Sequence, residues 1–389
     1  MEYPSTGRRI WTGALSLSMW LSACGGEAGE VQMLPPGAPI ALSEVPILTV
    51  GERADDPTHE FDRVVTPFLF LNGVGVPLSG EGTIRIFDSD GDLVRTLGAS
   101  GEGPGEFTRL SSAWARGDTV EAFDGALNRI TRFVPGQSAE TILLEGVSSA
   151  QVAVPGLADG SWVLYGVKKV QRDGRDLIAV HRFAPDGRHL GQLCETFGFR
   201  RHSYPGGTGP DPISPRPLVR TEGQKVLVAE TLTPHITELD GLTGATRSVE
   251  WTPRRVMGAG EAAQVARAAV TEPDVPEGTQ SRTLASFDAL TGNEDVSVFW
   301  DFLVDEKGFF WIRDYDPSTH SASLGGLGST GSGGEWSVLD RDGQYVTTIT
   351  VPKDFEPLAI ESHQLIGIRR DEFDVESVRV YKIARSGES

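Results

Sequence analysis

Five acidic residues are the strongest candidates for chemistry in this sequence. Each follows a β-rich run by one to several residues, so each is expected near the end of a strand. If those strand ends met, the carboxylates would form an oxygen-rich site of the kind that Ca²⁺ prefers. The plainer interpretation, which we favour, is that they hydrogen-bond to neighbouring turns or pair with Arg313 or Arg370. The five candidates are Asp124, Glu230, Asp314, Asp371 and Glu372.

Other motifs lack residues that the corresponding chemistry requires. The run GEGPGEF at 101–107 is rich in glycine but has no Lys-Ser/Thr pair for a phosphate, so we expect a connecting loop in which Glu102 and Glu106 are candidate contact residues. The run DSDGD at 88–92 lacks the later glutamate of a calcium-binding loop. The histidines do not have the spacing of a zinc site, and no Gly-x-Ser-x-Gly elbow supports a serine hydrolase.

The composition excludes some classes of partner. The formal net charge is −19, and no cluster of five or more basic residues occurs. A field of this sign repels phosphates, so we expect no nucleic-acid partner. There are two cysteines, Cys24 and Cys194. If Cys24 is modified, Cys194 has no partner within the chain, and the fold must be held by burial and strand pairing.

The start of the chain has the order of a secretion signal. Two arginines precede an apolar stretch that is too short to span a bilayer, and LSAC ends this segment. LSAC resembles the lipobox of bacterial lipoproteins, which implies a signal peptide over 1–23 and lipidation of Cys24. Gly25, in place of aspartate, favours the outer membrane by the same resemblance. We expect a flexible tether over 24–43 and a chain anchored to the cell envelope, facing the periplasm or the exterior.

Two repeated elements run through the remaining sequence. A turn that usually contains glycine precedes a β-rich run, as in DGSWVL at 159–164 and KGFFWI at 307–312. A polar turn with glycine between apolar runs follows, as in FDSDGDLV at 87–94 and FAPDGRHL at 183–190. Six copies of the first element occur, and the unit is roughly 45 residues once insertions are removed, which is the length of four strands. This spacing predicts an all-β, six-bladed propeller over 44–385.

The ends of the repeat predict how the ring closes. The last repeat is one strand short, because only a short polar tail follows the run 378–383. The apolar run 45–50 lies upstream of the first repeat and can supply that strand, which would protect the sheet edges. Three insertions are expected. The first is a Pro/Gly-rich loop at 197–217, in which Arg200 and Arg201 are candidate contact residues. The others are a helical insertion at about 258–290, with its helix at 260–269, and a mobile low-complexity loop at 317–335.

Two stretches, 84–107 and 369–381, resemble NHL-repeat-like six-bladed propeller lipoproteins of the bacterial envelope. The resemblance extends over nearly the whole mature chain but is specific only in these stretches. It implies the propeller fold. It implies little about activity, because propellers host many functions.

We therefore expect a monomeric, lipid-anchored binding or scaffold module without a required cofactor, and we favour a protein without catalytic activity over an enzyme. Its partner would be an envelope protein or a small molecule. The alternative is a divalent-metal-dependent hydrolase of gluconolactonase-like type that uses the channel-mouth carboxylates and Ca²⁺. Glycan or peptide binding through tryptophans is weaker, because Trp162, Trp311 and Trp336 alternate with apolar residues, as core residues do.

Overall fold

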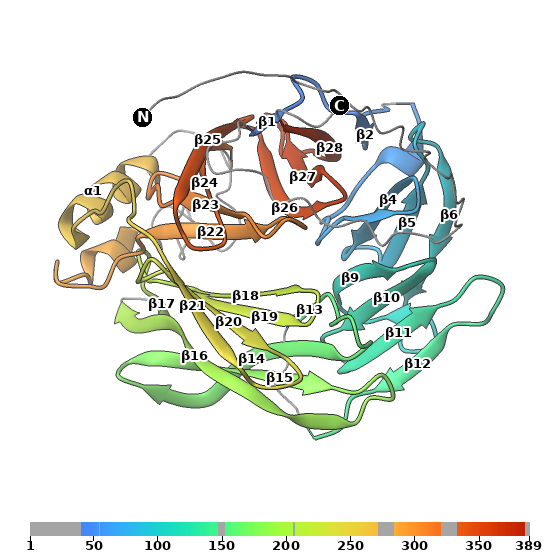
Figure 1. The fold of residues 1–389 in the computed structure, drawn as a ribbon, viewed down its shortest axis with the longest axis horizontal. Coiled ribbons are helices and arrows are strands. Elements are labelled where there is room, and N and C mark those ends of the chain that lie inside the picture. The colour runs from blue at the N-terminus through green and yellow to red at the C-terminus, as the bar shows by residue number, and fades with distance from the viewer. Residues whose placement is uncertain are drawn as a thin grey trace, which may run out of the picture. The chain divides into compact units, whose positions relative to one another are not determined.

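The computed structural model describes residues 40–53, 55–146, 152–204, 207–270, 284–319 and 333–385. These residues form a six-bladed β-propeller with one short helical insertion, as predicted (Figure 1). The proposed signal peptide, Cys24 and the tether up to residue 39 lie outside the described residues, as do 271–283 and 320–332 of the insertions. In the part of the chain that is described, no helix has both the length and the apolarity needed to cross a membrane.

Each blade is an antiparallel sheet whose strands follow one another in sequence. Blade I contains β3 (Phe68–Phe70), β4 (Gly73–Leu78), β5 (Thr83–Phe87) and β6 (Leu93–Leu97). Blade II contains β9 (Leu110–Arg116), β10 (Thr119–Asp124), β11 (Arg129–Phe133) and β12 (Glu140–Leu143). Blade III contains β13 (Val152–Val154), β14 (Trp162–Arg172), β15 (Arg175–Phe183), β16 (His189–Tyr204) and β17 (Gly207–Pro210).

The second half of the ring repeats this plan. Blade IV contains β18 (Pro217–Glu222), β19 (Lys225–Glu230), β20 (His235–Asp240) and β21 (Thr246–Glu250). Blade V contains β22 (Phe299–Val304), β23 (Phe310–Asp314), β24 (Gly334–Leu339) and β25 (Tyr345–Val351). Blade VI contains β26 (Phe355–Glu361), β27 (Gln364–Arg370) and β28 (Glu376–Arg385). A short parallel pair, β7 (Ala99–Ser100) and β8 (Glu106–Phe107), connects blades I and II.

The repeated glycines have a packing role between blades. Gly187 and Gly343 lie in the turns before the fourth strands of blades III and V, with φ of 89° and 80°, a region that favours glycine. A Cβ at Gly187 would lie 2.1 Å from the carbonyl oxygen of Leu143, in the outer strand of blade II. A Cβ at Gly343 would lie 2.1 Å from the carbonyl oxygen of Glu250, in the outer strand of blade IV. The glycine therefore lets each turn pack directly on the preceding blade.

The N-terminal segment completes blade VI. Strand β2 (Leu48–Val50) pairs with Val378–Val380 of β28, within the run 45–50 that was expected to close the ring. Strand β1 (Ile40–Leu42) also pairs with β28, so the sheet takes in the last residues of the segment 24–43 that was assigned to the tether. Both segments pair with β28 because this strand is long enough for two short strands to form hydrogen bonds along the same edge.

A buried histidine fixes this closure to blade I. His59 ends the short 3₁₀ helix η1 (Pro57–His59), and its Nδ1 accepts a hydrogen bond of 2.8 Å from the backbone N–H of Gly51. Its Nε2 lies 3.1 Å from the carbonyl oxygen of Gly91. Only the neutral ring with its proton on Nε2 satisfies both contacts. Burial lowers the pKa of His59, which favours this neutral form.

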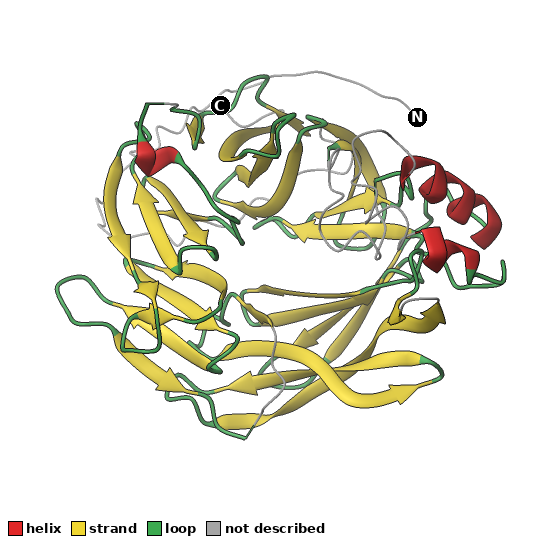
Figure 2. Cartoon of the chain, turned by 180° about the vertical axis from the view of Figure 1, so that it is seen from behind, coloured by secondary structure: helices red, strands yellow, loops and turns green. Residues whose placement is uncertain are grey.

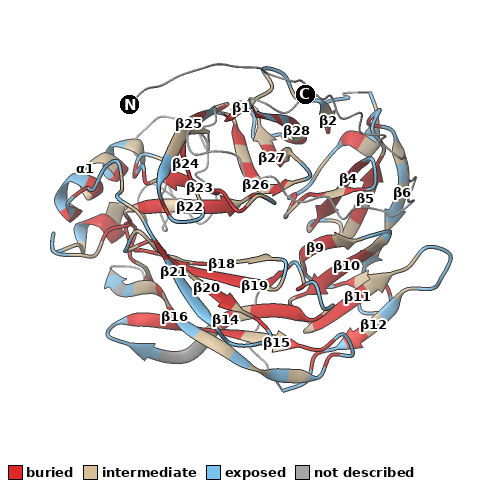
Figure 3. Ribbon diagram, in the orientation of Figure 1, coloured by how far each residue is buried: buried red, intermediate tan, exposed pale blue. Residues whose placement is uncertain are grey.

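Apolar side chains pack between neighbouring blades. Buried residues accordingly occur along the strands of the blades (Figure 3). Trp114 and Phe123 of blade II pack in one cluster with Phe183 of blade III, and Val76 of blade I packs with Ile366 of blade VI. Burial of each such side chain contributes about 1.5–3 kcal/mol. This buried core also contains the three tryptophans that were considered as ligand contacts, namely Trp162, Trp311 and Trp336.

The insertions differ in part from the prediction. Helix α1 (Ala259–Val270) contains the expected helical run and lies at the edge of the propeller (Figure 2). Its small residues pack in a separate buried cluster that includes Phe287 and Tyr315. The loop expected at 197–217 is wrong over its first part, because residues 197–204 continue β16 and then pair with β17. The alternating side chains of this stretch suit a strand.

Candidate functional site

The central feature of the propeller is a cavity of about 590 Å³ on its axis. Residues from the innermost strands of all six blades, or from the segments next to them, line it. It is the one described cavity that every blade helps to form, so we take it as the candidate site. Its volume is within the range of about 300–1,000 Å³ that is usual for small-molecule pockets.

The cavity meets the inner strands at different points along their length, at the start of the strand in blade I and at its end in blades IV to VI. Glu222 and Glu361 end the inner strands β18 and β26 and stand opposite the first residues of the second strands. Asp305 follows the inner strand β22 in the same way. In blades IV, V and VI, therefore, the cavity lies where the inner strand turns into the second strand.

The two halves of the cavity wall differ in chemistry. Blades I to III contribute mainly apolar groups, among them Phe68, Trp114 and Val154. Blades IV to VI contribute the acidic groups Glu222, Asp305, Glu306 and Glu361. The strand positions explain the division. Blades I and II line the cavity with the first part of their inner strands, which is apolar or uncharged, whereas blades IV to VI line it with the strand ends, where the acidic residues lie.

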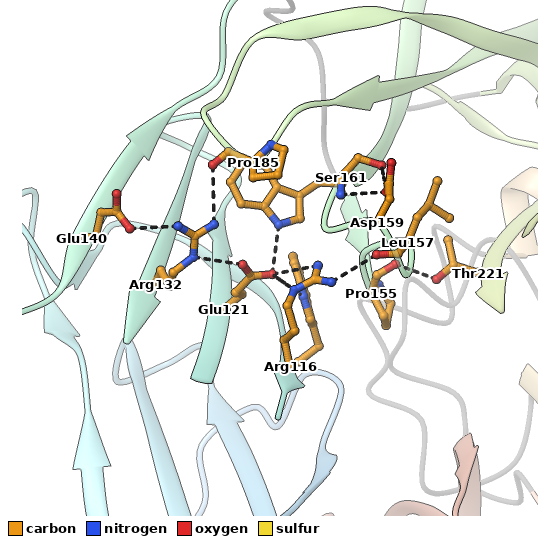
Figure 4. Close-up of polar contacts among 12 residues, drawn as sticks. Arg116, Glu121, Arg132, Glu140, Pro155, Leu157, Asp159, Ser161, Pro185 and Thr221 are labelled. Atoms are coloured by element: carbon orange, nitrogen blue, oxygen red, sulfur yellow. Dashed lines mark hydrogen bonds and ion pairs between the residues drawn. The ribbon is translucent and has the colours of Figure 1, made fainter. Parts of the chain in front are cut away.

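A buried carboxylate network holds the apolar half in place (Figure 4). Glu121 in β10 is 1% exposed and accepts hydrogen bonds from the indole N–H groups of Trp114, at 3.0 Å, and Trp162 of blade III, at 2.9 Å. Arg116 and Arg132 of blade II also donate to Glu121, at 3.3 and 3.2 Å. The network thus joins blades II and III and fixes the indole of Trp114 at the cavity wall.

Two of the four acidic groups have close partners. Asp305 is fully buried, accepts from Trp311 Nε1 at 3.2 Å and pairs with the buried Arg385 at the end of β28. Glu306 lies 2.9 Å from Nδ1 of His363. These contacts tie blade V to blade VI, and Asp305 has no exposed surface left for a ligand.

The other two acidic groups are less well compensated. Glu222 has an ion pair with Lys225 only at 3.9 Å, and that lysine is closer to Glu238, at 3.3 Å. The carboxylate of Glu361 has neither a hydrogen bond nor an ion pair within the part of the chain that the structure describes. Burial raises the pKa of both carboxyls, because the charged form loses water and no close cation compensates fully for that loss.

Polar groups also lie deeper in the cavity. Arg220 is ion-paired at 2.9 Å to Asp301, which also contacts Arg216 at 3.1 Å. Tyr165 lines the cavity near this group, and burial raises the pKa of its hydroxyl. Ser112 lines the cavity as well, is 5% exposed, and has an Oγ without a hydrogen-bond partner in the described residues. An orphaned buried hydroxyl of this kind costs stability unless something else satisfies it.

The carboxylates singled out from the sequence lie at strand ends, but not in this cavity. Asp124 is buried and accepts four backbone N–H groups, including Thr108 at 2.8 Å and Ala126 at 2.9 Å. Glu230 accepts from Arg175 at 2.8 Å, and Asp314 has an ion pair with Arg254 at 3.9 Å.

The last two of these carboxylates follow β27. Asp371 accepts the backbone N–H groups of Phe373 and Val375, both at 2.9 Å, and Glu372 is exposed in the same turn. Glu230 and Asp314 end the second strands of blades IV and V, and each stands opposite the first residue of the inner strand. The length of the inner strand therefore separates them by roughly 15–20 Å from the acidic residues at its other end.

The described residues contain no group of three or more His, Cys, Asp or Glu side chains that could hold a metal ion. The candidate carboxylates are held by separate partners and offer no shared ligand set for Ca²⁺ in this part of the chain. A metal role for them stays a prediction without support from this geometry.

The candidate loop contacts have structural partners. The backbone oxygens of Glu102 and Glu106 accept from Arg129, at 2.8 and 2.7 Å, and the Glu106 carboxylate accepts from the backbone N–H of Gly103. Arg200 pairs with Asp295 at 2.6 Å, and Arg201 pairs with Asp176 at 2.8 Å.

Sequence reasoning did not single out Glu222 and Glu361 as site residues. A usable signal was present, since both immediately precede the recurring turn between the first and second strands. The carboxylates that were predicted from the sequence lie instead at the ends of the second strands, at the opposite end of these sheets.

The chain matches no family model and no curated protein sequence. Solved structures do resemble it. A protein from Bacteroides fragilis that is assigned as exported has a TM-score of 0.50 and 11% identity, over 89% of this chain and 95% of that one. A member of the DUF4221 family from Bacteroides vulgatus has a TM-score of 0.49 and 9% identity, over 90% of this chain and 99% of that one.

A gluconolactonase from Xanthomonas campestris has a TM-score of 0.42 and 13% identity, over 90% of this chain and 100% of that one. At these identities a likeness concerns the fold alone, and of these three only the Bacteroides fragilis protein reaches a TM-score of 0.5.

Proposed function

We propose that this chain is an exported, lipid-anchored binding module of the bacterial envelope, and that it holds a small molecule in the central cavity. The observation that carries the binding role is the cavity of about 590 Å³ to which all six blades contribute. Its mixture of apolar wall and a few polar groups is typical of small-molecule sites.

The proposed location depends on the sequence around Cys24, which resembles a lipobox. The exported protein from Bacteroides fragilis supports it weakly, through the shared fold. Several acyl chains on one N-terminal cysteine would give stable membrane attachment, whereas a single chain binds reversibly.

No observation in the described residues favours the alternative, a metal-dependent hydrolase. Catalysis of that type needs converging ligands for the cation, and the described carboxylates form no such group. We therefore propose binding without a metal-dependent reaction.

Cavity binding can be tested with Nile red, a neutral aromatic dye that fluoresces in apolar surroundings. We expect saturable binding with one dye per chain. Ala359 lines the cavity, so Ala359→Phe should weaken this binding by partly filling it. Ala245 is exposed in a turn, and Ala245→Phe should leave binding unchanged. Equal binding by both variants, or no saturable binding by the native protein, would overturn the cavity assignment.

The anchor can be tested by metabolic labelling with an alkyne-bearing fatty acid. The native chain should carry the label and remain in the membrane fraction, and Cys24→Ser should lose both properties. Cys194→Ser is the matched control, because burial raises the pKa of the Cys194 thiol to about 11 and keeps it unreactive. Labelling that survives Cys24→Ser would refute the proposed anchor.

A further inference from the structure

The charged groups of the cavity do not cancel. Arg220 pairs with Asp301, which it shares with Arg216, and Asp305 pairs with Arg385. Glu306 has His363 beside it. Glu361 has no counter-ion in the described residues, and Glu222 has only a distant, shared lysine. The cavity therefore has an excess of negative charge on the side formed by blades IV and VI.

This excess charge lies in an enclosed space. Burial alone raises the pKa of Glu361, so no nearby cation offsets the loss of water around its carboxylate. Burial is also the largest influence on Glu222. A ligand cation placed beside such a carboxylate would regain part of the lost solvation energy, whereas an anion would be repelled.

The rest of the cavity defines the body of the ligand. Opposite the acidic side, blades I to III present apolar groups such as Phe68, Trp114 and Val154. Ser112 also belongs to that wall, but its Oγ has no exposed surface and is not available to a ligand. An apolar body with a single polar end therefore matches this wall better than a sugar with many hydroxyls.

We propose that the cavity is selective for a small organic cation, a protonated amine on an apolar body, with Glu361 as the group that recognises the ammonium and Glu222 as a second acidic group of the same cavity. This inference rests on the proposed function, because it assumes that the cavity is a ligand site. It assigns to the chain a ligand class that is set by charge complementarity rather than by a metal.

Three probes of equal size test this selectivity, namely 4-phenylbutylamine, 4-phenylbutanol and 4-phenylbutanoate. Isothermal titration at neutral pH with the full-length protein should show the amine bound at least about tenfold more tightly than the alcohol, since each tenfold step corresponds to about 1.4 kcal/mol and one charge-assisted hydrogen bond contributes at least that much. The carboxylate should bind more weakly than the alcohol.

Variants separate recognition from folding. Glu361→Gln keeps the size of the side chain and should reduce amine affinity about tenfold while leaving affinity for the alcohol within a factor of about two. Glu222→Gln should have a smaller effect in the same direction, because Lys225 already compensates it in part. Glu145 is exposed and lies outside the cavity, so Glu145→Gln should change neither affinity.

The outcomes distinguish this inference from the proposed function. Equal affinity for amine and alcohol would overturn the cation selectivity and leave the cavity as a neutral binding site. Preference for the carboxylate would also overturn it and would point to Arg220 as the recognising group. Failure of all three probes together with failure of Nile red would overturn the cavity as a ligand site.

Discussion

Glu121→Gln should destabilise the propeller strongly although it changes neither the size nor the shape of the side chain. All four residues that approach the Glu121 carboxylate do so with N–H donors, from Trp114, Trp162, Arg116 and Arg132. A carboxylate accepts at both oxygens, whereas an amide replaces one oxygen with an NH₂ group that can only donate. One donor must therefore lose its partner and face another donor.

The size of the effect follows from the contacts. The most favourable amide orientation keeps the oxygen toward the two indoles and Arg116, and turns the NH₂ toward Nε of Arg132. This loses one hydrogen bond to a charged acceptor, which contributes about 1.5–3 kcal/mol, and weakens the others by removing the charge. Because the carboxylate is 1% exposed, solvent cannot replace the lost partner, and we expect a loss of about 2–4 kcal/mol in the free energy of unfolding.

Glu140 provides a matched control. It pairs at 2.9 Å with the same Arg132, but its side chain is 57% exposed. Exposed ion pairs contribute about 0.2–1 kcal/mol, so Glu140→Gln should cost no more than about 1 kcal/mol. Urea titrations followed by tryptophan fluorescence and by far-ultraviolet circular dichroism would measure both variants, with a single common transition as the condition for comparing them.

The reasoning would be refuted if the two glutamine variants lost the same stability. A loss below about 1 kcal/mol for Glu121→Gln would mean that water or a rearranged arginine satisfies the site, and that burial does not set the cost. Glu121→Ala is a second reference, since it leaves both arginines without this carboxylate and should cost about 3–5 kcal/mol.

Two further predictions concern the turn between the third and fourth strands and the closure of the ring. Gly187→Ala should lower the free energy of unfolding by about 2–4 kcal/mol in urea titration, because its Cβ would meet the carbonyl oxygen of Leu143 and the residue would also have a strained positive φ. Gly136 has a φ of 74° and open space around it, so Gly136→Ala should cost only about 1 kcal/mol. Similar losses for the two variants would contradict the packing role. Because the pKa of His59 is lowered in the folded state, the unfolded chain binds more protons, so this stabilisation should be complete above the unfolded value of about 6.5 and should decline as pH falls below it. His59→Gln should flatten the dependence of the urea midpoint on pH between 5 and 7, and an unchanged dependence would exclude His59 as its source.

The blades were predictable because their signals are local. Each second strand follows a short turn, and each of the three clearest fourth strands follows a turn whose glycine at positive φ is visible in the sequence, as at Gly91, Gly187 and Gly343. The closing strand could be placed only approximately. The segment Ile40–Leu42 is short, and only pairing with β28 makes it a strand.

The site was less predictable because it depends on contacts between distant parts of the chain. Asp305 and Arg385 are 80 residues apart, and nothing in the local sequence of either indicates the other. The sequence also does not reveal which part of each inner strand lines the cavity. Carboxylates such as Asp124 and Glu222 both stand at strand ends, and only the packing of the blades shows that Asp124 is taken up by backbone N–H groups while Glu222 faces the cavity.

The pairing of β1 and β2 with β28 has a consequence for the order in which the molecule can form. The residues that complete blade VI are synthesised more than 300 positions before the strand that they join, so they must wait unpaired while the other blades assemble. Bringing such distant segments together carries a large entropic cost that local hairpins avoid. The seam between β28 and its N-terminal partners should accordingly be the last part of the ring to form and the first to open, and a permuted chain that links the two directly would fold faster into the same native state.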